Sequence, residues 1–361
     1  MTRPPHVLHM VPALFSNGDG ITGGAERYAF ELARHMAEVV PTTLVSFGEK
    51  SRHETIGGLS IRVIGKPWYV RGQRSNPVAL SIFNELRAAD IVHCHQQHIL
   101  VSSLAAFACR VLGRRVFVTD LGGGGWDISA YLSTDKWYHG HLHISEYSRK
   151  ISKHEEKPWG HVIRGGVDTE KFSPDDSVPR EQTVLFVGRL LPHKGIDNLI
   201  EGLPTGLSLE IIGQVYDQKY FQDLRMMAER KAVTLRHDCD DRSLVKAYRR
   251  AMCTVLPSVY KNMYGGETRV PELLPQVLLE AMACATPVIC TDIAGMSKIV
   301  EDRVSGFVVP PNNAFALGEK LNWLREHNPE ARALGQAARY RVLENFTWPT
   351  VVRRCLEIYA G

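Results

Sequence analysis

Two successive sets of short apolar runs, each alternating with longer amphipathic segments, constrain the fold of this chain most strongly. The first set is HVLHMV, TTLVSF, IRVI, IVHCH, VFVTD and HLHIS, and the second is TVLFVGR, SLEIIG, VTLRH, CTVLPS, PVICTD and GFVVPP. Strand-length runs separated by helix-length segments predict parallel α/β layers. Because the pattern restarts after residues 173–180, we expect two doubly wound α/β domains, with a boundary near residues 165–182.

Segments with helical periodicity lie between these runs. The predicted helices cover residues 25–38, 79–89, 217–230, 240–251, 277–283, 314–327 and 349–359. The longest apolar stretch, 99–113, is broken by Ser102, Ser103 and Arg110. It is too short to span a bilayer, and we interpret it as a buried helix.

Composition narrows the class of protein. With 361 residues, 44% of them hydrophobic, the chain can build two cores. A net charge of +4 without a long basic run excludes an extended nucleic-acid interface. The N-terminal segment lacks the features of a signal peptide, and the seven cysteines include no CxxC pair. We therefore expect a cytoplasmic protein with reduced core cysteines.

Two loops between a strand and a helix have the composition of phosphate-binding loops. In GDGITGGAE, at 18–26, glycines allow close backbone approach, and the following helix offers free N–H groups to an anion. In GRLLPHKG, at 188–195, Arg189 and Lys194 are suited to clamp a diphosphate. The alternatives are a flexible turn and solvated surface charges. Neither the dinucleotide fingerprint GxGxxG nor a P-loop is matched.

A third segment carries two carboxylates eight positions apart. Glu272 precedes a predicted helix, and Glu280 lies inside it, within the apolar run VLLEAMACA. Carboxylates accept the hydrogen bonds of sugar and ribose hydroxyls. A charge without a partner in such an apolar run would be costly, which argues against a merely solvated Glu280.

Together these segments resemble the GT4 family of retaining glycosyltransferases, which have the GT-B fold. The similarity rests on GGAE at 23–26, VGRLLPHKG at 187–195, the pair Glu272 and Glu280 with the following EAMACATPVICTDIAGMSKIV, and the linker VIRGGVDTEKFSP. It covers nearly the whole chain and implies two Rossmann-like domains facing a central cleft. The implied division is an acceptor-binding domain at 1–170, a nucleotide-sugar-binding domain at 171–345, and a helix at 346–361 that packs back on the N-terminal domain.

The resemblance also implies roles for individual residues. Arg189 and Lys194 would hold the donor diphosphate, Glu272 the donor sugar and Glu280 the ribose. Further donor contacts would come from Gly23, Gly24, Leu274, Pro275 and Gln276. The donor would be a UDP- or GDP-sugar, the acceptor a glycan or a lipid-linked molecule, and no cofactor or metal would be needed. Transfer with retention would proceed by front-face attack, without a side-chain nucleophile.

The chain departs from the family pattern at two places. Asp120 stands where many members have a His near the donor sugar, and it is able to hydrogen-bond a sugar hydroxyl or accept a proton. The glycines at 122–125 beside it are expected to form a mobile loop over the cleft, and a phosphate cradle is the alternative. An insertion of about ten residues by comparison with the family, at 261–271, precedes Glu272. Either it shapes donor or acceptor choice, or it is a decorative loop.

Histidines and aromatic residues suggest further contacts. His95 and Trp126 are predicted to contact the acceptor. His93, His95 and His98 form one group, and His139, His141 and His143 another, but no nearby carboxylate or cysteine spacing completes a metal site. We therefore interpret them as polar cleft residues.

Other functions remain open at this stage. A nucleotide-sugar epimerase with the GT-B fold would need no acceptor, and a non-catalytic nucleotide-sugar-binding protein would lack polar groups in the N-terminal domain. The helix at 25–38 and the segment KPWYVRGQR, at 66–74, have the composition for a peripheral contact with the inner face of the membrane. An ordinary core helix and an exposed loop are the alternative.

Overall fold

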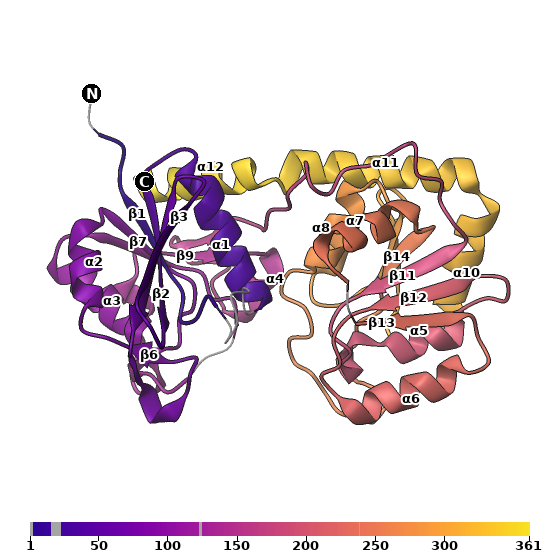
Figure 1. Ribbon diagram of the computed structural model, residues 1–361, viewed down its shortest axis with the longest axis horizontal. Coiled ribbons are helices and arrows are strands. Elements are labelled where there is room, and N and C mark those ends of the chain that lie inside the picture. Colours follow the sequence, from indigo (N-terminus) through magenta and orange to yellow (C-terminus); the bar gives the residue numbers. More distant parts are fainter. Residues whose placement is uncertain (1–2, 16–22, 123–124, 238) are drawn as a thin grey trace. The chain divides into compact units, whose positions relative to one another are not determined.

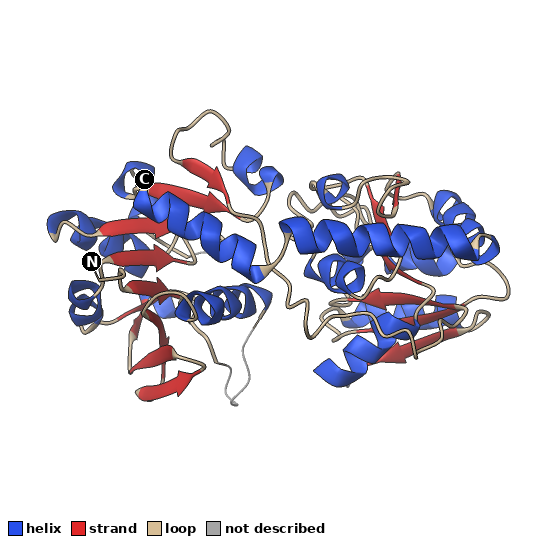
Figure 2. Ribbon diagram, turned by 90° about the horizontal axis from the view of Figure 1, so that it is seen from above, coloured by secondary structure: helices blue, strands red, loops and turns tan. Residues whose placement is uncertain are grey.

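A computed structural model describes residues 3–15, 23–122, 125–237 and 239–361. The chain forms two compact units. The N-terminal unit is Met1–Gly166 with Trp348–Gly361, and the C-terminal unit is Val167–Thr347. Each contains a sheet flanked by helices, which confirms the predicted doubly wound α/β class (Figures 1 and 2).

The N-terminal unit is built on an eight-stranded sheet. In spatial order its strands are β10 (Gly160–Val162), β9 (Gly140–His143), β8 (Arg115–Val118), β7 (Ile91–Cys94), β1 (Val7–Met10), β2 (Thr42–Gly48), β4 (Leu59–Gly65) and β3 (Arg52–Ile56). All neighbouring pairs are parallel except β3 and β4. The run RHETI of β3 is polar because it forms an exposed edge strand, so apolar patterning did not predict it.

Helices cover both faces of this sheet. Helix α1 (Gly24–Ala37) packs against α12 (Trp348–Ala360), and α2 (Ile82–Ala88) packs against α3 (Leu100–Val111). Successive strand residues point to opposite faces. Leu44 accordingly packs on the α1 side, whereas Val45 and Phe47 belong to the core under α2 and α3.

Helix α3 is only partly buried, which corrects the interpretation of 99–113 as a buried helix. Its inner positions, including Val101, Ala105 and Cys109, are fully packed. Phe107 and Val111 are instead largely exposed. Only one stripe of a helix on the face of a sheet can reach that sheet, whatever the composition of the rest.

The C-terminal unit contains a six-stranded sheet in which all pairs are parallel. In spatial order its strands are β13 (Val233–Arg236), β12 (Ser208–Ile212), β11 (Thr183–Val187), β14 (Cys253–Leu256), β15 (Val288–Thr291) and β16 (Phe307–Val309). Its main helices are α5 (Ile196–Gly202), α6 (Gln218–Ala228), α7 (Asp241–Arg250), α8 (Gln276–Ala283), α10 (Ala314–Glu326) and α11 (Asn328–Asn345). Helices α5 and α6 lie on one face of the sheet, and α7 and α8 on the other (Figure 1).

Local sequence signals account for several helix starts. Helices α6 and α7 each begin after an aspartate whose carboxylate accepts a backbone N–H of the first turn: Asp217 from Tyr220 and Asp240 from Ser243. Helix α11 was not predicted. Its buried face is formed largely by small residues, Ala331, Gly335 and Ala338, which give a weak periodic signal.

The cysteines are free thiols, and all are buried except the partly exposed Cys239, as predicted for core residues. Within the part of the chain that the structure describes, every helix is too short or too polar to cross a bilayer.

Candidate active site

The predicted phosphate loop of the C-terminal unit docks onto the loop that follows the neighbouring strand. Strands β11 and β14 are adjacent and parallel, so their carboxyl ends share one edge of the sheet. The backbone N–H of Val259 donates to the carbonyl of His193 at 2.8 Å. Gly195 has φ +65°, and a Cβ there would lie 2.1 Å from the carbonyl oxygen of Pro257. Only glycine allows this close approach.

This docking brings Lys194 to Glu272. Nζ of Lys194 lies 2.5 Å from Oε1 of Glu272, and Oγ of Ser258 donates to the same oxygen at 2.7 Å. Both charged residues are buried, with 9% and 8% of their surfaces exposed. The two residues, 78 positions apart in the sequence, form one ion pair at the carboxyl edge of the sheet.

Glu280 has a separate partner. It lies inside α8 and is buried, and its Oε2 accepts a hydrogen bond of 2.8 Å from the hydroxyl of Tyr248 on α7. Burial, reinforced by the charge of Glu280, raises the pKa of Tyr248 well above its ordinary value. The phenol therefore remains a donor, and this bond helps to offset the cost of burying the carboxylate.

The other donor-site residues of this unit lie close by in the chain. Arg189 follows β11 and is exposed, with its guanidinium carbon 5.5 Å from the ring centre of Tyr216. Leu274, Pro275 and Gln276 form the N-terminal end of α8. The first turn of a helix has backbone N–H groups without intrahelical partners, the feature on which the predicted sugar contact depends.

The insertion is anchored to its own unit. The hydroxyl of Tyr264 bonds to Asp223 of α6, and Nζ of Lys219 lies 4.1 Å from the Tyr264 ring centre. The backbones of Lys261 and Glu267 pair in an isolated antiparallel β-bridge within the loop. These contacts hold residues 261–271 against α6.

In the N-terminal unit, the described part of the glycine loop begins at Gly23. Gly23 is the residue before α1, and Gly24 is its first residue. The preceding residues 18–22 of the predicted loop lie outside the described part of the chain. Burial raises the pKa of Glu26, in the first turn of α1.

Asp120 lies just beyond β8 and is half-buried. Its Oδ1 accepts a long contact of 3.4 Å from the N–H of Gly122. The adjacent Thr119 is fully buried, and its hydroxyl lies 2.8 Å from Nε2 of His93. Residues 123 and 124 lie outside the described chain, so the predicted mobile loop remains a prediction.

His95 lies in the interior, which argues against a direct acceptor contact. Only 3% of its surface is exposed, and its Nε2 is 2.8 Å from Nδ1 of His9 on the neighbouring strand. Trp126 is partly exposed, with the guanidinium carbon of Arg71 5.0 Å from its ring centre. Of the two predicted acceptor contacts, Trp126 is therefore the accessible one.

The first group of histidines in the structure is not the group that sequence spacing predicted. His93 and His95 join His9 rather than His98, because strand pairing sets His9 opposite His93. Burial lowers the pKa of His9 to about 3 and holds those of His93 and His95 well below the ordinary value. These imidazoles are therefore neutral at pH 7.

His141 joins Asp135 and His154 rather than His139. Nε2 of His141 lies 3.1 Å from the backbone oxygen of Asp135, and Nδ1 of His154 lies 3.1 Å from Nε2 of His143. Sequence spacing did not reveal this carboxylate, because the turn before β9 brings Asp135 back beside the strand. The absence of a functional metal remains a prediction.

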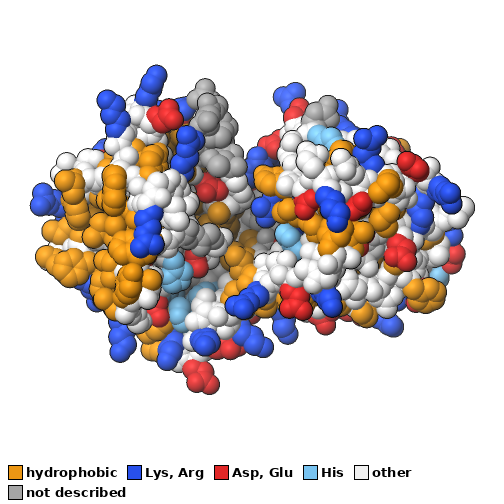
Figure 3. Space-filling view, turned by 90° about the horizontal axis from the view of Figure 1, so that it is seen from below, with side chains coloured by type: hydrophobic (Ala, Val, Ile, Leu, Met, Phe, Trp, Pro, Cys, Tyr) orange, Lys and Arg blue, Asp and Glu red, His pale blue; other side chains and the backbone are white. Residues whose placement is uncertain are grey.

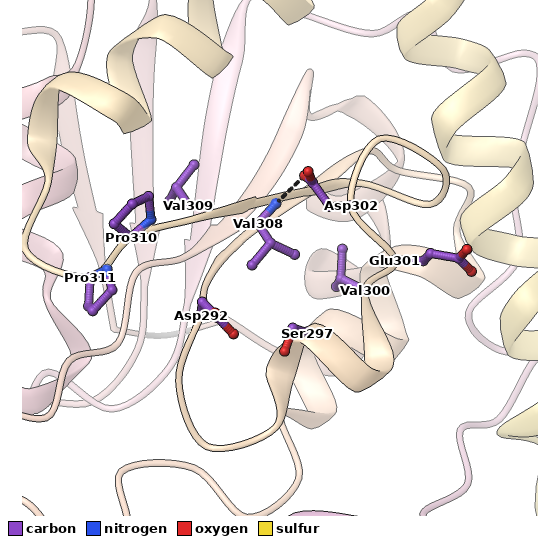
Figure 4. A pocket seen from close by; sticks show the side chains of 9 residues that line it. All are labelled: Asp292, Ser297, Val300, Glu301, Asp302, Val308, Val309, Pro310 and Pro311. Atoms are coloured by element: carbon purple, nitrogen blue, oxygen red, sulfur yellow. Dashed lines mark hydrogen bonds between the residues drawn. The ribbon is translucent and has the colours of Figure 1, made fainter.

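The C-terminal unit also has a pocket of about 550 Å³ that contains none of the predicted site residues (Figure 4). It is lined by three carboxylates, Asp292, Glu301 and Asp302, and by no Lys or Arg. Asp302 accepts a hydrogen bond from the N–H of Val308 at 2.9 Å. Such a lining repels a diphosphate, so this pocket does not suit the donor.

Comparisons with known proteins relate both units to glycosyltransferases. The model described as "Glycosyltransferase Family 4" matches residues 22–171, and the model described as "Glycosyl transferases group 1" matches residues 167–341. The crystal structure of HepE from Anabaena in complex with UDP superposes with a TM-score of 0.75 at 16% identity, covering 98% of this chain and 99% of that one. Sucrose-phosphate synthase from Thermosynechococcus elongatus gives 0.72 at 19% identity, covering 99% and 98%.

Relatives identified by sequence fall into two groups. Alpha-maltose-1-phosphate synthase of Mycolicibacterium smegmatis is 28% identical over 227 residues, which are 55% of this chain and 56% of that protein. The chain thus spans about half the length of several curated relatives that it matches. GDP-mannose:cellobiosyl-diphosphopolyprenol alpha-mannosyltransferase of Xanthomonas oryzae pv. oryzae is 25% identical over 370 residues, 93% of each protein.

The chain consists of two α/β units, each built on a mainly parallel sheet, and it superposes over nearly its full length on solved glycosyltransferase structures. It therefore has the GT-B fold. Each unit matches the corresponding glycosyltransferase model. The chain accordingly belongs to the GT4 family of glycosyltransferases.

Proposed function

We propose that this protein is a retaining glycosyltransferase that moves a sugar from a nucleotide diphosphate sugar to an acceptor hydroxyl in polysaccharide or glycoconjugate biosynthesis. The observation that carries the proposal is the cluster of Lys194, Glu272 and Ser258 at the carboxyl edge of the second sheet. This edge is where parallel α/β sheets bind ligands. The cluster combines a cation for phosphate with a carboxylate for sugar hydroxyls.

In the proposed reaction, the C-terminal unit binds the donor. Arg189 and Lys194 contact the diphosphate, Glu280 the ribose, and Glu272 the sugar. As the bond from the anomeric carbon to the diphosphate breaks, the two cations stabilise the charge that develops on the leaving group. Breakdown of this bond requires neither a side-chain nucleophile nor a cofactor, since the acceptor oxygen attacks from the face that the diphosphate leaves.

The N-terminal unit is proposed to bind the acceptor, with Gly23 and Gly24 approaching the donor phosphates. Asp120 would hydrogen-bond a hydroxyl of the sugar, and the acceptor proton would pass to the departing phosphate. Trp126 would contact the acceptor. HepE, a solved structural neighbour, is in complex with UDP, and the relative that matches 93% of the chain is named for a GDP-mannose donor and a diphosphopolyprenol acceptor. These names support a UDP- or GDP-sugar and a glycan or lipid-linked acceptor.

The test is thermal unfolding of the purified chain with UDP, GDP and their sugars. A ligand that binds only the native state raises the melting temperature. We expect a shift with one nucleotide, abolished by Glu280→Ala and by Arg189→Ala combined with Lys194→Ala. The absence of a shift with every nucleotide, in protein shown to be folded, would contradict the proposal.

A second measurement separates transfer from the alternatives. A transferase releases nucleotide diphosphate at a rate that depends on acceptor, whereas an epimerase changes the donor sugar without acceptor. A non-catalytic protein would bind the nucleotide and release no product.

A further inference from the structure

Two histidines and an aspartate meet near the outer edge of the N-terminal sheet, away from the candidate donor site. Asp135 begins the short 3₁₀ helix Asp135–Trp137, His141 lies on β9, and His154 lies in the loop between α4 (Glu146–Ile151) and β10. Each of the three side chains has a potential metal-ligand atom within 4.8 Å of those of the other two. Because β10 is the outer strand of the sheet, three separate segments come together beside this edge.

Backbone contacts fix the loop that carries His154. The N–H of His154 donates to the carbonyl of Arg149 in α4 at 3.0 Å, and the N–H of His141 donates to the carbonyl of Trp159 at 2.7 Å. A Cβ on Gly160 would lie 2.5 Å from the carbonyl oxygen of His154, so only glycine lets β10 begin so close to this loop. The loop is therefore folded back onto β9.

The two imidazoles are shielded from water, whereas the carboxylate is not. His141 and His154 are 2% and 6% exposed. The indole of Trp159 packs against both rings, with distances between ring centres of 4.7 and 4.5 Å. Asp135 is only partly buried. Histidine side chains reach the surface of the N-terminal unit in the view of Figure 3. The partly exposed carboxylate gives an ion access to an otherwise buried site.

Hydrogen bonds hold one nitrogen of each imidazole and leave the other for a ligand. Nε2 of His141 lies 3.1 Å from the backbone oxygen of Asp135. Because a carbonyl only accepts, Nε2 carries the hydrogen, and the lone pair of the neutral ring lies on Nδ1. Nδ1 of His154 lies 3.1 Å from Nε2 of His143, and Nε2 of His154 has no hydrogen bond to a described residue. Histidines that bind metals are typically held in this way, through the second ring nitrogen.

Asp135 supplies the charged ligand. Its Oδ1 accepts a hydrogen bond of 2.7 Å from Nε2 of Gln97, and its Oδ2 lies 3.4 Å from Oγ of Ser133. A carboxylate has about four lone pairs, so these contacts leave positions for an ion. Gln97, in the loop after β7, thus orients the carboxylate without saturating it.

The other histidine group of this unit lacks these properties. Both ring nitrogens of His93 are occupied, by the hydroxyl of Thr119 and, at 2.6 Å, by the hydroxyl of Tyr359. Nδ1 of His9 faces Nε2 of His95 at 2.8 Å, and no carboxylate of the described chain joins the group. An ion there would have to displace these hydrogen bonds. We interpret that group as a hydrogen-bonded part of the core.

We propose that Asp135, His141 and His154 bind one Zn²⁺ ion. Imidazole and carboxylate together suit zinc, whereas Mg²⁺ and Ca²⁺ prefer oxygen ligands alone. Zinc–ligand bonds of about 2.1 Å would draw the three side chains closer together. Three protein ligands leave a fourth position for water. This assignment replaces the interpretation of His141 as a polar cleft residue.

The ion would tie the loop after α4 to β9 and to the short helix before it. Because no such arrangement exists in the unfolded chain, zinc binding would stabilise the N-terminal unit. The proposal is independent of glycosyl transfer, since the proposed reaction uses no metal.

The test uses the untagged full chain, stripped with EDTA and then given ZnCl₂, MgCl₂ or CaCl₂. After gel filtration, elemental analysis should find one Zn²⁺ per chain and neither of the other two ions. Zinc should raise the melting temperature of the stripped protein. Co²⁺ in place of zinc should give the strong visible absorption of a four-coordinate site. These measurements on the parent chain need no variant.

Asp135→Asn and His154→Asn should each lose the bound zinc. His143→Leu, which removes the partner of His154, should raise the Kd for zinc about tenfold to a hundredfold. His53→Asn, at an exposed histidine of β3, is the matched control and should keep the ion. Circular dichroism melts in EDTA verify that the variants fold.

The proposal is overturned if the parent chain retains no zinc after gel filtration. It is also overturned if the Asp135 and His154 variants retain zinc as the His53 control does. Loss of zinc in His9→Asn alone would assign the ion to the other histidine group and would equally refute the proposed site.

Discussion

The ammonium group of Lys194 and the carboxylate of Glu272 form an ion pair, with Nζ 2.5 Å from Oε1. In the proposed reaction these two groups contact different parts of one donor, the diphosphate and the sugar. A diphosphate arriving at Lys194 would compete with Glu272 for the ammonium. We infer that the ion pair gives both buried groups a partner before the donor binds. When the diphosphate takes the place of Glu272 at Lys194, the carboxylate becomes free to accept hydrogen bonds from the sugar hydroxyls.

Removing one member of this pair should destabilise the fold as well as stop transfer. Lys194→Met leaves Glu272 buried without its cation, a change that costs about 3 to 5 kcal/mol in comparable pairs. The double variant Lys194→Met with Glu272→Gln should regain much of the lost free energy of unfolding but no activity. Urea unfolding of the two variants measures this. Equal stabilities of the single and double variants would mean that the pair is not formed in solution.

Glu280→Gln should weaken donor binding while the protein stays folded. An amide retains the size of the side chain but loses the charge-assisted hydrogen bonds to the ribose hydroxyls, which corresponds to about a tenfold to hundredfold increase in donor Kd. Calorimetric titration with the nucleotide diphosphate measures it.

Tyr248→Phe tests whether the hydroxyl of Tyr248 positions the carboxylate of Glu280. It removes the 2.8 Å hydrogen bond to Glu280 and leaves the charge in place. We expect a smaller increase in donor Kd than for Glu280→Gln. Unchanged binding in both variants would place the ribose elsewhere.

Arg189→Ala should lower kcat without lowering stability. The side chain is exposed, so its loss leaves no buried group without a partner. Loss of one preorganised donor to a developing charge typically costs about a hundredfold to a thousandfold in rate. Arg303→Ala is the control, since its side chain is 78% exposed and distant in sequence from the site. Steady-state rates with saturating donor distinguish the two.

Asp120→Asn should reduce kcat and leave nucleotide binding intact. The amide is a weaker hydrogen-bond acceptor for the sugar hydroxyl than the carboxylate is, and loss of a charge-assisted hydrogen bond lowers the rate by about tenfold to a hundredfold. Nucleotide should still raise the melting temperature of this variant. A parent-like kcat would show that Asp120 does not take the place of the usual His.

Stability should fall in mild acid because of the buried histidines. Burial lowers the pKa of His9 and of His143 to about 3 and that of His141 to about 4, from 6.5. The unfolded chain therefore binds protons below pH 6.5 that the folded chain rejects. Each such imidazole reduces the free energy of unfolding by up to about 1.4 kcal/mol per pH unit as the pH falls towards its folded pKa.

Urea unfolding at several pH values between neutrality and pH 5 measures how steeply the free energy of unfolding falls with pH. His9→Asn should reduce the pH dependence of the free energy of unfolding by up to one proton. An equal slope in the His9 variant would show that His9 is not buried in the folded state.

Much of the fold followed from local pattern. Apolar runs of strand length identified the central strands, and the spacing of apolar residues identified most helices. The edge strand β3 and helix α11 were not predicted, because their exposed or small residues give little periodic signal. The sequence also identified Lys194, Glu272 and Glu280 as donor-site candidates, since each occupies a chemically unusual place within a strand–loop–helix pattern.

The tertiary structure decided which of these groups meet. Pairing of Lys194 with Glu272 depends on β11 lying beside β14, and the grouping of His9 with His93 and His95 depends on β1 lying beside β7. The outer stripe of α3 likewise looked like core in the sequence and proved to be surface. The reason is physical: periodicity along the chain encodes local conformation, whereas the order of strands and the side of a helix that is covered are set by contacts between residues far apart in the sequence.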